Sequence, residues 1–363
     1  MSGACDTCLR RAFLVARLAP RIEGLLQRPT ELRPSVLALG EEPLIEALAG
    51  PAEAALRNWL ESFRPAAARE QVEAAGCWIA CSHADPYPAG LGQLTDAPAV
   101  LFGRGREDCL ERLASEPAVT LVGARRGSPY GLEIARALGR GLGASGLPVV
   151  SGLALGIDGA AHQGCLDGGG TPIAVLAGGP DLPYPRRHRW LYERIRTSGA
   201  ILSEMPPGRR AFRWSFPARN RIMAALAAMT VVVEAAEPSG SLITADFARD
   251  LGRLVGAVPG KVTNRVAAGS NRLLQDGAHV VVGPEDVLDQ IYGVGSRPRP
   301  EPVEPEDQGM RAVLAAVEEC SDPAEIPRRA GMEAAEARSA LGRLEAEGWI
   351  ARDALGGYER RAG

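Results

Sequence analysis

Short runs of apolar, often β-branched residues recur along the middle of the chain. These runs occupy 119–123, 147–152, 171–178, 200–204, 230–235, 254–260 and 279–283. Most are separated by amphipathic stretches such as YGLEIARALGRGLGASG and LITADFARDLGR. Strands that are apolar throughout and alternate with helices indicate a parallel sheet covered on both faces, joined by right-handed crossovers. Residues 76–293 are therefore predicted to form an extended Rossmann-like α/β domain.

The two ends of the chain have a different periodicity. In residues 1–75 apolar positions recur at three- and four-residue steps between prolines, which predicts a small helical domain for packing or interaction. Residues 294–308, VGSRPRPEPVEPEDQ, are rich in proline and charge and are expected to be an extended linker. Residues 309–363 read as three helices and a strand–GG–strand hairpin, which is the order of a winged-helix domain.

The charge of this last segment bears on its partner. Residues 309–363 carry eight arginines against ten acidic residues, a net charge of −2. A surface that binds duplex DNA is normally strongly basic. We therefore expect the winged-helix-like domain to contact protein, and its partner stays open.

The overall composition excludes few classes of function. The net charge of −3 over 363 residues does not favour nucleic acid, so any such inference rests on local charge. Lys261 is the only lysine, so nearly all positive charge is arginine. We see no signal peptide and no apolar run long enough to span a bilayer. The seven scattered cysteines fit reduced thiols, and a cytoplasmic location is expected.

Two cysteine pairs raise the question of a metal. Cys5 and Cys8 form a CxxC motif, and Cys77 and Cys81 form CxxxC. A zinc site that joins the two pairs is one interpretation. Free thiols are favoured, because the second pair lies in the strand-like segment GCWIACS and not in a knuckle. We therefore expect neither a metal nor another cofactor.

Three loops between a strand and a helix have the features of anion sites. They are VGARRGSPYG at 122–131, VVSGLALGIDGAAH at 149–162 and EPSGSLITADFA at 237–248. Glycines let backbone amides approach a ligand, and the helix that follows offers its positive N-terminus. Because ligands of open α/β sheets bind beyond the carboxyl ends of the strands, three such loops together predict a phosphate-bearing ligand.

The segment 208–221, GRRAFRWSFPARNR, combines arginines with aromatic residues. Arg209, Arg210, Arg213, Arg219 and Arg221 are interleaved with Phe212, Trp214 and Phe216, and no acid interrupts them. Arginine neutralises phosphates, and exposed aromatic rings stack on unpaired bases. Duplex DNA offers no base faces, so the mixture favours single strands. The alternative is that the aromatic residues belong to the core and the arginines to a solvated face.

Hydrolase chemistry is a further alternative. Ser151, Asp158 and His162 are a possible triad, but no GxSxG motif surrounds Ser151. Asp158 and His162 lie four residues apart at a helix start, where capping and a structural hydrogen bond are the favoured roles. The other histidines, His83, His188 and His279, show no metal-ligand spacing. We therefore expect a protein that is not an enzyme.

The central motifs resemble those of the DNA-processing protein A family (DprA, also called Smf). They span residues 85–278 and comprise DPYPAGL, VGARRGSPYG, SGLALGIDGAAH, GGTPIAVLAGG, YP (184–185), SE (203–204), FPARNRI, VVVEAAEPSGSLITADFA, AVPG and GSNRLLQDGA. The helical, SAM-like N-terminus and the winged-helix-like tail also resemble many members. The resemblance implies a non-catalytic, homodimeric protein that binds and protects incoming single-stranded DNA and loads the RecA recombinase onto it during natural transformation.

The resemblance also implies a set of DNA-binding residues. The first two loops supply Gly123, Arg125, Ser151 and Gly152. The segment that follows Trp214 and its flanks supply Arg213, Phe216, Arg219, Asn220 and Arg221, with Phe216 as the stacking residue. Ser239, Gly240, Ser241 and Thr244 lie nearby, where capping of a helix is an equal alternative.

The chain departs from the family pattern in three respects, one of which is Cys165 in the helix after His162, where alanine is common. IMAALAAM follows the Arg219–Arg221 motif, where members usually have a glycine and then a serine. Lysines that help some members bind DNA are absent, so arginine would substitute. Two other interpretations stay open: a nucleotide-processing enzyme of a related Rossmann-like fold, and a nucleotide sensor. The PGGxGTxxE motif of one such enzyme family is absent, and five arginines exceed what a mononucleotide needs.

Overall fold

The chain forms two compact units, Met1–Arg297 and Pro298–Gly363. The computed structural model describes residues 3–26, 35–295, 305, 307–320, 322–347, 349–352 and 356–360. Most of the predicted linker, 294–308, lies outside the described residues. No helix within the described ranges is long and apolar enough to cross a membrane.

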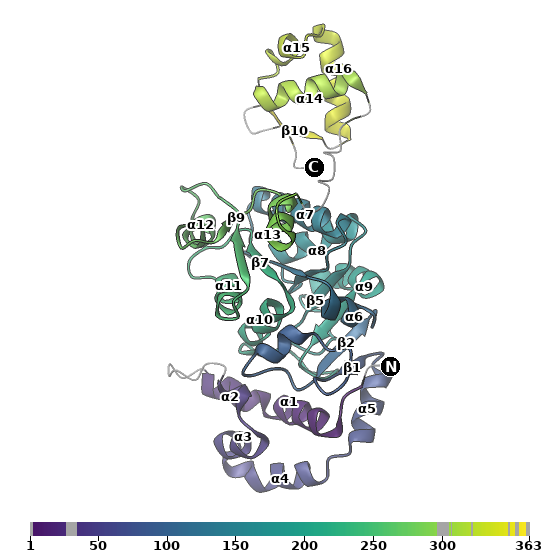
Figure 1. The fold of residues 1–363 in the computed structure, drawn as a ribbon, viewed down its shortest axis with the longest axis vertical. Helices are drawn as coiled ribbons and strands as arrows, with labels where there is room; N and C mark the ends of the chain where they lie inside the picture. The colour runs from purple at the N-terminus through teal and green to yellow at the C-terminus, as the bar shows by residue number, and fades with distance from the viewer. Residues whose placement is uncertain are drawn as a thin grey trace. The chain divides into compact units, whose positions relative to one another are not determined.

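The first unit is built on a nine-stranded sheet with the order β1-β2-β6-β5-β4-β3-β7-β8-β9 (Figure 1). From β6 to β9 all neighbouring strands are parallel. The strands are β1 Trp78–Ala80, β2 Leu101–Gly105, β3 Val119–Val122, β4 Val149–Ser151, β5 Pro172–Val175, β6 Ala200–Ser203, β7 Met229–Val232, β8 Leu254–Ala257 and β9 His279–Val280. The seven predicted apolar runs correspond to β3 to β9, and the Rossmann-like fold class is confirmed.

One edge of the sheet differs from the prediction of a wholly parallel arrangement. Strand β2 runs antiparallel to both β1 and β6. It was missed because its sequence, LFGRG, is not a continuous apolar run. Its Gly103 lies beneath the ring of Trp78, and a Cβ atom there would stand 2.1 Å from that ring. Packing of a distant tryptophan thus selects a residue that is unfavourable in a strand by itself.

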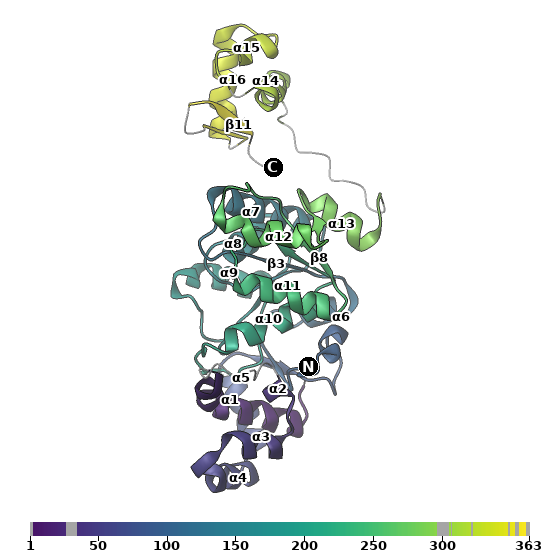
Figure 2. The ribbon, with the colours of Figure 1, turned by 90° about the vertical axis from the view of Figure 1, so that its left-hand side faces the viewer.

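Helices cover both faces of the sheet, as the alternation of strands and helices requires (Figures 1 and 2). On one face lie α7 Pro129–Ala144, α8 Ile157–Asp167, α9 Arg189–Ser198 and α13 Pro284–Tyr292. On the other lie α6 Cys109–Ser115, α10 Ser215–Leu226, α11 Gly240–Asp250 and α12 Ala268–Gln275. Successive strand residues point to opposite faces, so Leu121 packs in the first layer and Val122 in the second.

The N-terminal helices share their cores with the α/β region. They are α1 Asp6–Leu26, α2 Ser35–Ala38, α3 Glu41–Leu48, α4 Glu53–Glu61 and α5 Pro65–Ala74. Phe13 of α1 contacts Phe102 of β2, with 6.1 Å between ring centroids. The indole nitrogen of Trp214 donates a 3.0 Å hydrogen bond to the carbonyl of Ala19. Residues 1–75 and 76–293 therefore belong to one compact unit.

The second unit has its own small core. Helices α14 Gln308–Glu319, α15 Ile326–Arg329 and α16 Ala334–Ala346 precede a hairpin of β10 Ile350–Arg352 and β11 Tyr358–Arg360. Val313, Leu341 and Ile350 are buried among these elements. The element order is the one expected of a winged helix, and both that assignment and the partner of this unit stay predictions.

Candidate nucleic-acid interface

A pocket of about 440 Å³ lies where the carboxyl ends of β3 and β7 meet the loop after β4. Strand β7 lies beside β3, whereas β4 to β6 extend from the other side of β3, so this is the switch point of the sheet. Open α/β sheets bind their ligands at such a point. The pocket is lined by Val122, Gly123, Arg125, Ala154, Asp158, Phe216, Pro217, Arg219, Asn220, Met223, Pro238, Ser239, Gly240, Ser241, Ile243 and Thr244.

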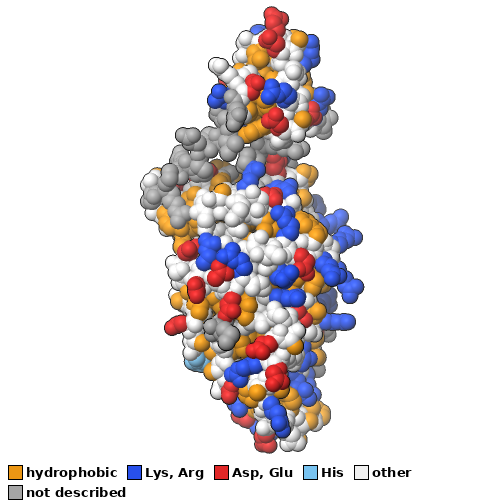
Figure 3. All heavy atoms as spheres, turned by 90° about the vertical axis from the view of Figure 1, so that its right-hand side faces the viewer, with side chains coloured by type: hydrophobic (Ala, Val, Ile, Leu, Met, Phe, Trp, Pro, Cys, Tyr) orange, Lys and Arg blue, Asp and Glu red, His pale blue; other side chains and the backbone are white. Residues whose placement is uncertain are grey.

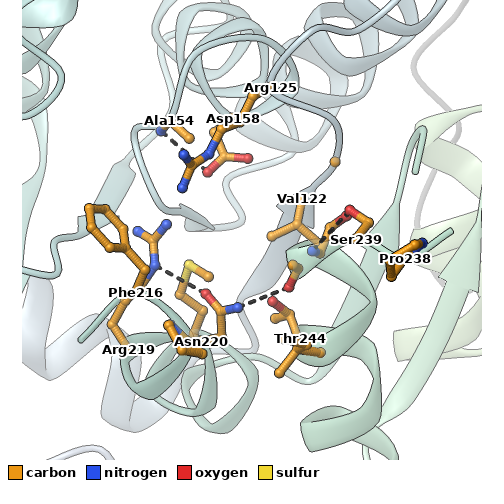
Figure 4. Close-up of a pocket in the computed structure, with 16 residues that line it drawn as sticks. Val122, Arg125, Ala154, Asp158, Phe216, Arg219, Asn220, Pro238, Ser239 and Thr244 are labelled. Carbon is orange, nitrogen blue, oxygen red and sulfur yellow. Dashed lines mark hydrogen bonds between the residues drawn. The ribbon is translucent and has the colours of Figure 1, made fainter. Parts of the chain in front are cut away.

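Arg219 of α10 forms one wall of the pocket (Figure 4). Its side chain is buried, and Nη1 donates to the carbonyl of Gly152 at 2.8 Å and to that of Val175. Nε donates to the amide oxygen of Asn220 at 3.1 Å. Burial lowers the pKa of Arg219, and the nearby Asp158 carboxylate opposes this effect. Arg219 therefore caps strand carbonyls and, at the same time, places a cation in the wall.

Asp158 compensates part of that charge. Its Oδ2 accepts hydrogen bonds from the backbone N–H groups of Gly152, at 3.1 Å, and Ala154, at 3.3 Å. Burial raises the pKa of Asp158, and the Arg219 guanidinium counteracts the shift. The acid thus holds the loop between β4 and α8, and it occupies amides that the sequence suggested for a ligand.

The loop after β3 is occupied in a similar way. The carboxylate of the buried Glu234 accepts hydrogen bonds from the backbone N–H of Ser128, at 2.7 Å, and from its hydroxyl, at 2.8 Å. This places a protein carboxylate at the N-terminus of α7. Of the three anion-prone loops, two are therefore already partly satisfied by acids of the chain itself.

The third loop, which leads into α11, opens onto the pocket. Ser239 caps the helix, because its hydroxyl accepts a 3.3 Å hydrogen bond from the N–H of Ser241. Asn220 donates to the carbonyl of Gly240 at 3.0 Å and ties this loop to α10. The buried hydroxyl of Thr244 faces the pocket without a hydrogen-bond partner in the described structure. The helix N-terminus and this hydroxyl form a polar wall suited to an anion.

Opposite this wall, two aromatic rings and an arginine line the pocket and its rim. The guanidinium carbon of Arg125 lies 5.5 Å from the ring centroid of Phe216. The ring of Tyr184 lies 5.5 Å from that of Phe216, and the tyrosine is 53% exposed. Tyr184 belongs to the YP motif but was not predicted to line the site, although its place beside the basic run PRRHR was a usable signal. Arg125 is exposed and has freedom to contact a ligand.

Two residues that were predicted to bind DNA are buried in the protein interior. Ser151 is fully buried, and its hydroxyl donates to the carbonyl of Leu121 at 2.6 Å. Arg221 is 1% exposed and donates to the carboxylates of Asp96 and Glu204, each at 2.8 Å. Neither residue lines the pocket. Both side chains point into the protein, and the expectation that they contact DNA stays a prediction.

The two glycines of this group also serve packing. A Cβ atom on Gly152 would stand 2.0 Å from the guanidinium of Arg219. A Cβ atom on Gly123 would stand 2.7 Å from Ile157 and 2.8 Å from the carbonyl of Glu234. Close approach of protein groups therefore accounts for both glycines. Around Gly240, in contrast, no described atom other than those of its chain neighbours and the nearby backbone of α11 lies within 4 Å of such a Cβ.

The aromatic residues of segment 208–221 divide between core and pocket. Trp214 is buried against α1, and Phe212 packs in the same hydrophobic cluster, whereas Phe216 lines the pocket. Arg213 is exposed but does not line the pocket. Further exposed arginines in this part of the chain are Arg126, Arg186, Arg187, Arg189, Arg209 and Arg210. Figure 3 shows basic side chains gathered along one edge of the α/β region.

The possible hydrolytic triad is not assembled. The Ser151 hydroxyl is engaged with Leu121, and neither ring nitrogen of the fully buried His162 has a hydrogen-bond partner among the described residues. Burial, aided by His188, lowers the pKa of His162 to about 3. A histidine without access to the pocket cannot serve as a general base there. The geometry thus supports binding and shows no constellation for chemistry among these residues.

Comparison with known proteins gives the family of this chain. A model of the family described as DNA recombination-mediator protein A matches residues 78–292, which is more than half of the chain. The chain belongs to this family. The family recognised from the sequence motifs is therefore confirmed. The matched residues include all nine strands, from β1 to β9, so they contain the whole sheet and the pocket.

Curated relatives of the family agree with the match. Protein Smf of Escherichia coli is 35% identical over 80% of this chain and 81% of its own length. A putative DNA processing protein DprA of Mycobacterium tuberculosis is 44% identical over 57% of this chain. The alignment spans about half of the Mycobacterium protein, 52% of its length.

Two solved structures have the same architecture. The X-ray structure of DprA from Streptococcus pneumoniae superposes with a TM-score of 0.62 at 32% identity, over 78% of this chain and 95% of that one. DprA from Helicobacter pylori superposes with a TM-score of 0.53 at 26% identity, over 59% and 95%. The latter structure was described for its single-stranded DNA binding mode. Both structures therefore share the α/β fold of this chain.

Proposed function

We propose that this family member binds single-stranded DNA in the pocket at the β3–β7 switch point and has no catalytic activity of its own. The observation that carries the proposal is the group formed by the exposed Arg125 and Tyr184 and the half-buried Phe216, opposite the N-terminus of α11. Rings stack on unpaired bases, and the cation and the helix N-terminus attract phosphate. The description of the Helicobacter relative supports the same ligand.

Arg125 and Phe216 are the central residues of the proposal, with Arg213 as a cation outside the pocket. Arg219, Asn220, Ser239, Ser241 and Thr244 shape its walls, and the open space at Gly240 admits a phosphate. Gly123 and Gly152 act indirectly, by letting the loops pack closely around Ile157 and Arg219.

Fluorescence anisotropy of a labelled oligonucleotide at two salt concentrations tests this proposal. Single-stranded DNA should bind in a salt-sensitive manner, and duplex or mononucleotide competitors should not displace it. Affinity falls with salt, and Arg125→Ala should make the slope of log affinity against log salt shallower by about 0.7, the value for one phosphate contact on a single strand. Full displacement by a mononucleotide would instead favour a nucleotide sensor or enzyme.

Arg106→Ala is the matched control. Arg106 follows β2, which is antiparallel to β6, and Gly105 lies opposite Ala200 at the start of β6. Arg106 is therefore at the far edge of the sheet from the pocket, and it is half exposed beside Asp108. Its removal changes net charge as Arg125→Ala does, so equal slopes in the two variants would contradict a local phosphate contact at Arg125.

We further propose that the bound strand is protected and passed to the RecA recombinase during natural transformation, in the cytoplasm and by a homodimer. The support is membership of the recombination-mediator family. The test is assembly of recombinase filaments on single-stranded DNA coated with single-strand binding protein. The full chain should accelerate assembly, and Phe216→Ala should reduce this effect in proportion to its loss of DNA affinity. No acceleration by a chain that binds DNA would refute the mediator role alone.

A further inference from the structure

Three cysteines and a histidine converge at the start of α1, away from the pocket. Cys5 directly precedes α1 and Cys8 lies in its first turn, whereas Cys81 and His83 follow β1. One ligand atom from each residue lies within 4.8 Å of all the others. His83 Nδ1 is 3.4 Å from Cys5 Sγ and 3.3 Å from Cys8 Sγ. The chain thus gathers four metal-ligating atoms from two distant segments, with His83 75 positions from Cys8 and 78 from Cys5.

These distances fit a tetrahedral metal ion. With Zn–S bonds of about 2.3 Å and Zn–N bonds of about 2.0–2.1 Å, a sulfur and a nitrogen ligand stand about 3.5 Å apart. The two measured S–N distances, 3.3 and 3.4 Å, are close to this value. Four protein ligands also leave no open coordination position, which is the mark of a structural zinc site.

The surroundings stabilise thiolates in this place. The backbone N–H of Cys5 points at Cys81 Sγ, 3.4 Å away, in the manner of a hydrogen bond to a metal-bound sulfur. The N-terminus of α1 favours negative charge next to it. Arg69 of α5 fixes the same turn, because it donates to the carbonyl of Ala4, at 2.8 Å, and the carboxylate of Asp6, at 2.6 Å.

We propose that Cys5, Cys8, Cys81 and His83 bind one structural Zn²⁺ ion that fastens α1 to the strand edge of the α/β sheet. The ion cross-links residues that lie on either side of a shared hydrophobic cluster, in which Cys8 and Cys81 pack with Phe13 and Phe102. Its binding free energy contributes to the stability of the N-terminal helices on the sheet.

This ligand set replaces the pairing suggested by the sequence. Cys77 and Cys81 stand on either side of β1, and four residues of extended strand span about 13 Å, so both cannot reach one ion. The Cys77 thiol points instead toward the carbonyl of Ala75, 3.6 Å away. A turn after Cys81 brings His83 back to the sulfurs. The proposed set thus includes His83, whose spacing in the sequence indicated no metal site, in place of the free thiols that the sequence favoured.

Metal analysis of the untagged full chain tests the proposal. The protein is expressed in zinc-supplemented medium, purified under reducing conditions and assayed by plasma mass spectrometry. We expect one zinc per chain. Removal of zinc and addition of Co²⁺ should produce the visible bands of tetrahedral cobalt together with a thiolate charge-transfer band in the near ultraviolet.

Variants locate the ion. Cys8→Ser should lose zinc, whereas Cys77→Ser, which changes a buried cysteine of the same cluster, should keep it. His83→Cys should retain zinc and shift the cobalt spectrum toward four thiolates, which a variant that had merely unfolded would not do. Zinc and DNA affinity are read separately, so this proposal does not depend on the proposed function.

Three results would overturn the zinc site. The first is a wild-type chain that contains no zinc and gives no cobalt–thiolate spectrum. The second is zinc retained in a Cys8→Ser, Cys81→Ser double variant. The third is equal loss of zinc in Cys77→Ser, with the cobalt spectrum of His83→Cys unchanged from wild type, because the ion would then have other ligands.

Discussion

Replacement of Arg221 tests whether this buried arginine stabilises the fold or contacts DNA. The Arg221 side chain is 1% exposed, and the carboxylates that it contacts belong to side chains that are 5% (Asp96) and 10% (Glu204) exposed. Burial opposes the charge, but Glu204 and Asp96 together raise the pKa of Arg221. The guanidinium also donates to the carbonyls of Asp96, at 2.8 Å, and Ala218, at 3.1 Å. The residue therefore connects α10 to two distant segments.

Arg221→Ala leaves two buried carboxylates without their cation. Loss of one partner from a buried ion pair costs about 3–5 kcal/mol, a large share of the about 5–15 kcal/mol that stabilises a typical domain. Arg106→Ala, which breaks an exposed pair with Asp108, should cost about 0–1 kcal/mol. Urea unfolding of both variants, followed by tryptophan fluorescence, gives the comparison.

DNA binding completes this test. Where circular dichroism shows that Arg221→Ala is still folded, the salt dependence of its affinity for single-stranded DNA should equal that of the wild type. The reasoning fails if the variant unfolds at the wild-type urea concentration while its salt slope becomes shallower. That result would mean that Arg221 contacts phosphate in solution and that its burial does not persist.

Three further outcomes are expected. Phe216→Ala should weaken single-strand binding by about 1–3 kcal/mol without changing the salt slope, because a ring contributes stacking and no charge; a changed slope in the anisotropy titration would contradict this. Gly240→Ala has room in the free protein, so it should unfold at the wild-type urea concentration but bind DNA more weakly if phosphate approaches there. Gly152→Ala should instead lower the free energy of unfolding, because its Cβ would overlap the guanidinium of Arg219. His162 has a pKa lowered from 6.5 to about 3, so the unfolded state binds the extra proton and stability should fall as pH drops below 6.5. His162→Leu should flatten that part of the stability profile, and an unchanged profile would show that His162 is not its source.

Most of the fold was predictable because its signals are local. The apolar runs of β3 to β9 and the amphipathic stretches between them specify strands and helices through short-range periodicity. Strand β2 was not predicted, because Gly103 is required there by the ring of Trp78 and not by its neighbours in the sequence. The loops of the pocket were also predictable, since glycines and helix starts mark them in the sequence.

The roles of individual site residues were predictable only in part. Arg219 and Arg221 are two positions apart on α10 and read alike in the sequence. Both are buried, yet Arg219 lines the pocket while Arg221 meets an acid 125 positions away. Which groups oppose a side chain depends on elements that are distant in the chain, and no local pattern records them.

The sequence by itself determined the family, the order of strands and helices and the place of the loops around the pocket, because these follow from periodicity and short motifs. Only the tertiary structure decided that acids of the chain occupy two of the three anion-prone loops, that Tyr184 joins Phe216, and that His83 joins the cysteines 75 and 78 positions before it. The physical reason is the same in each case: hydrogen bonds, stacking and metal coordination act over a few ångströms in space, whatever the separation along the chain.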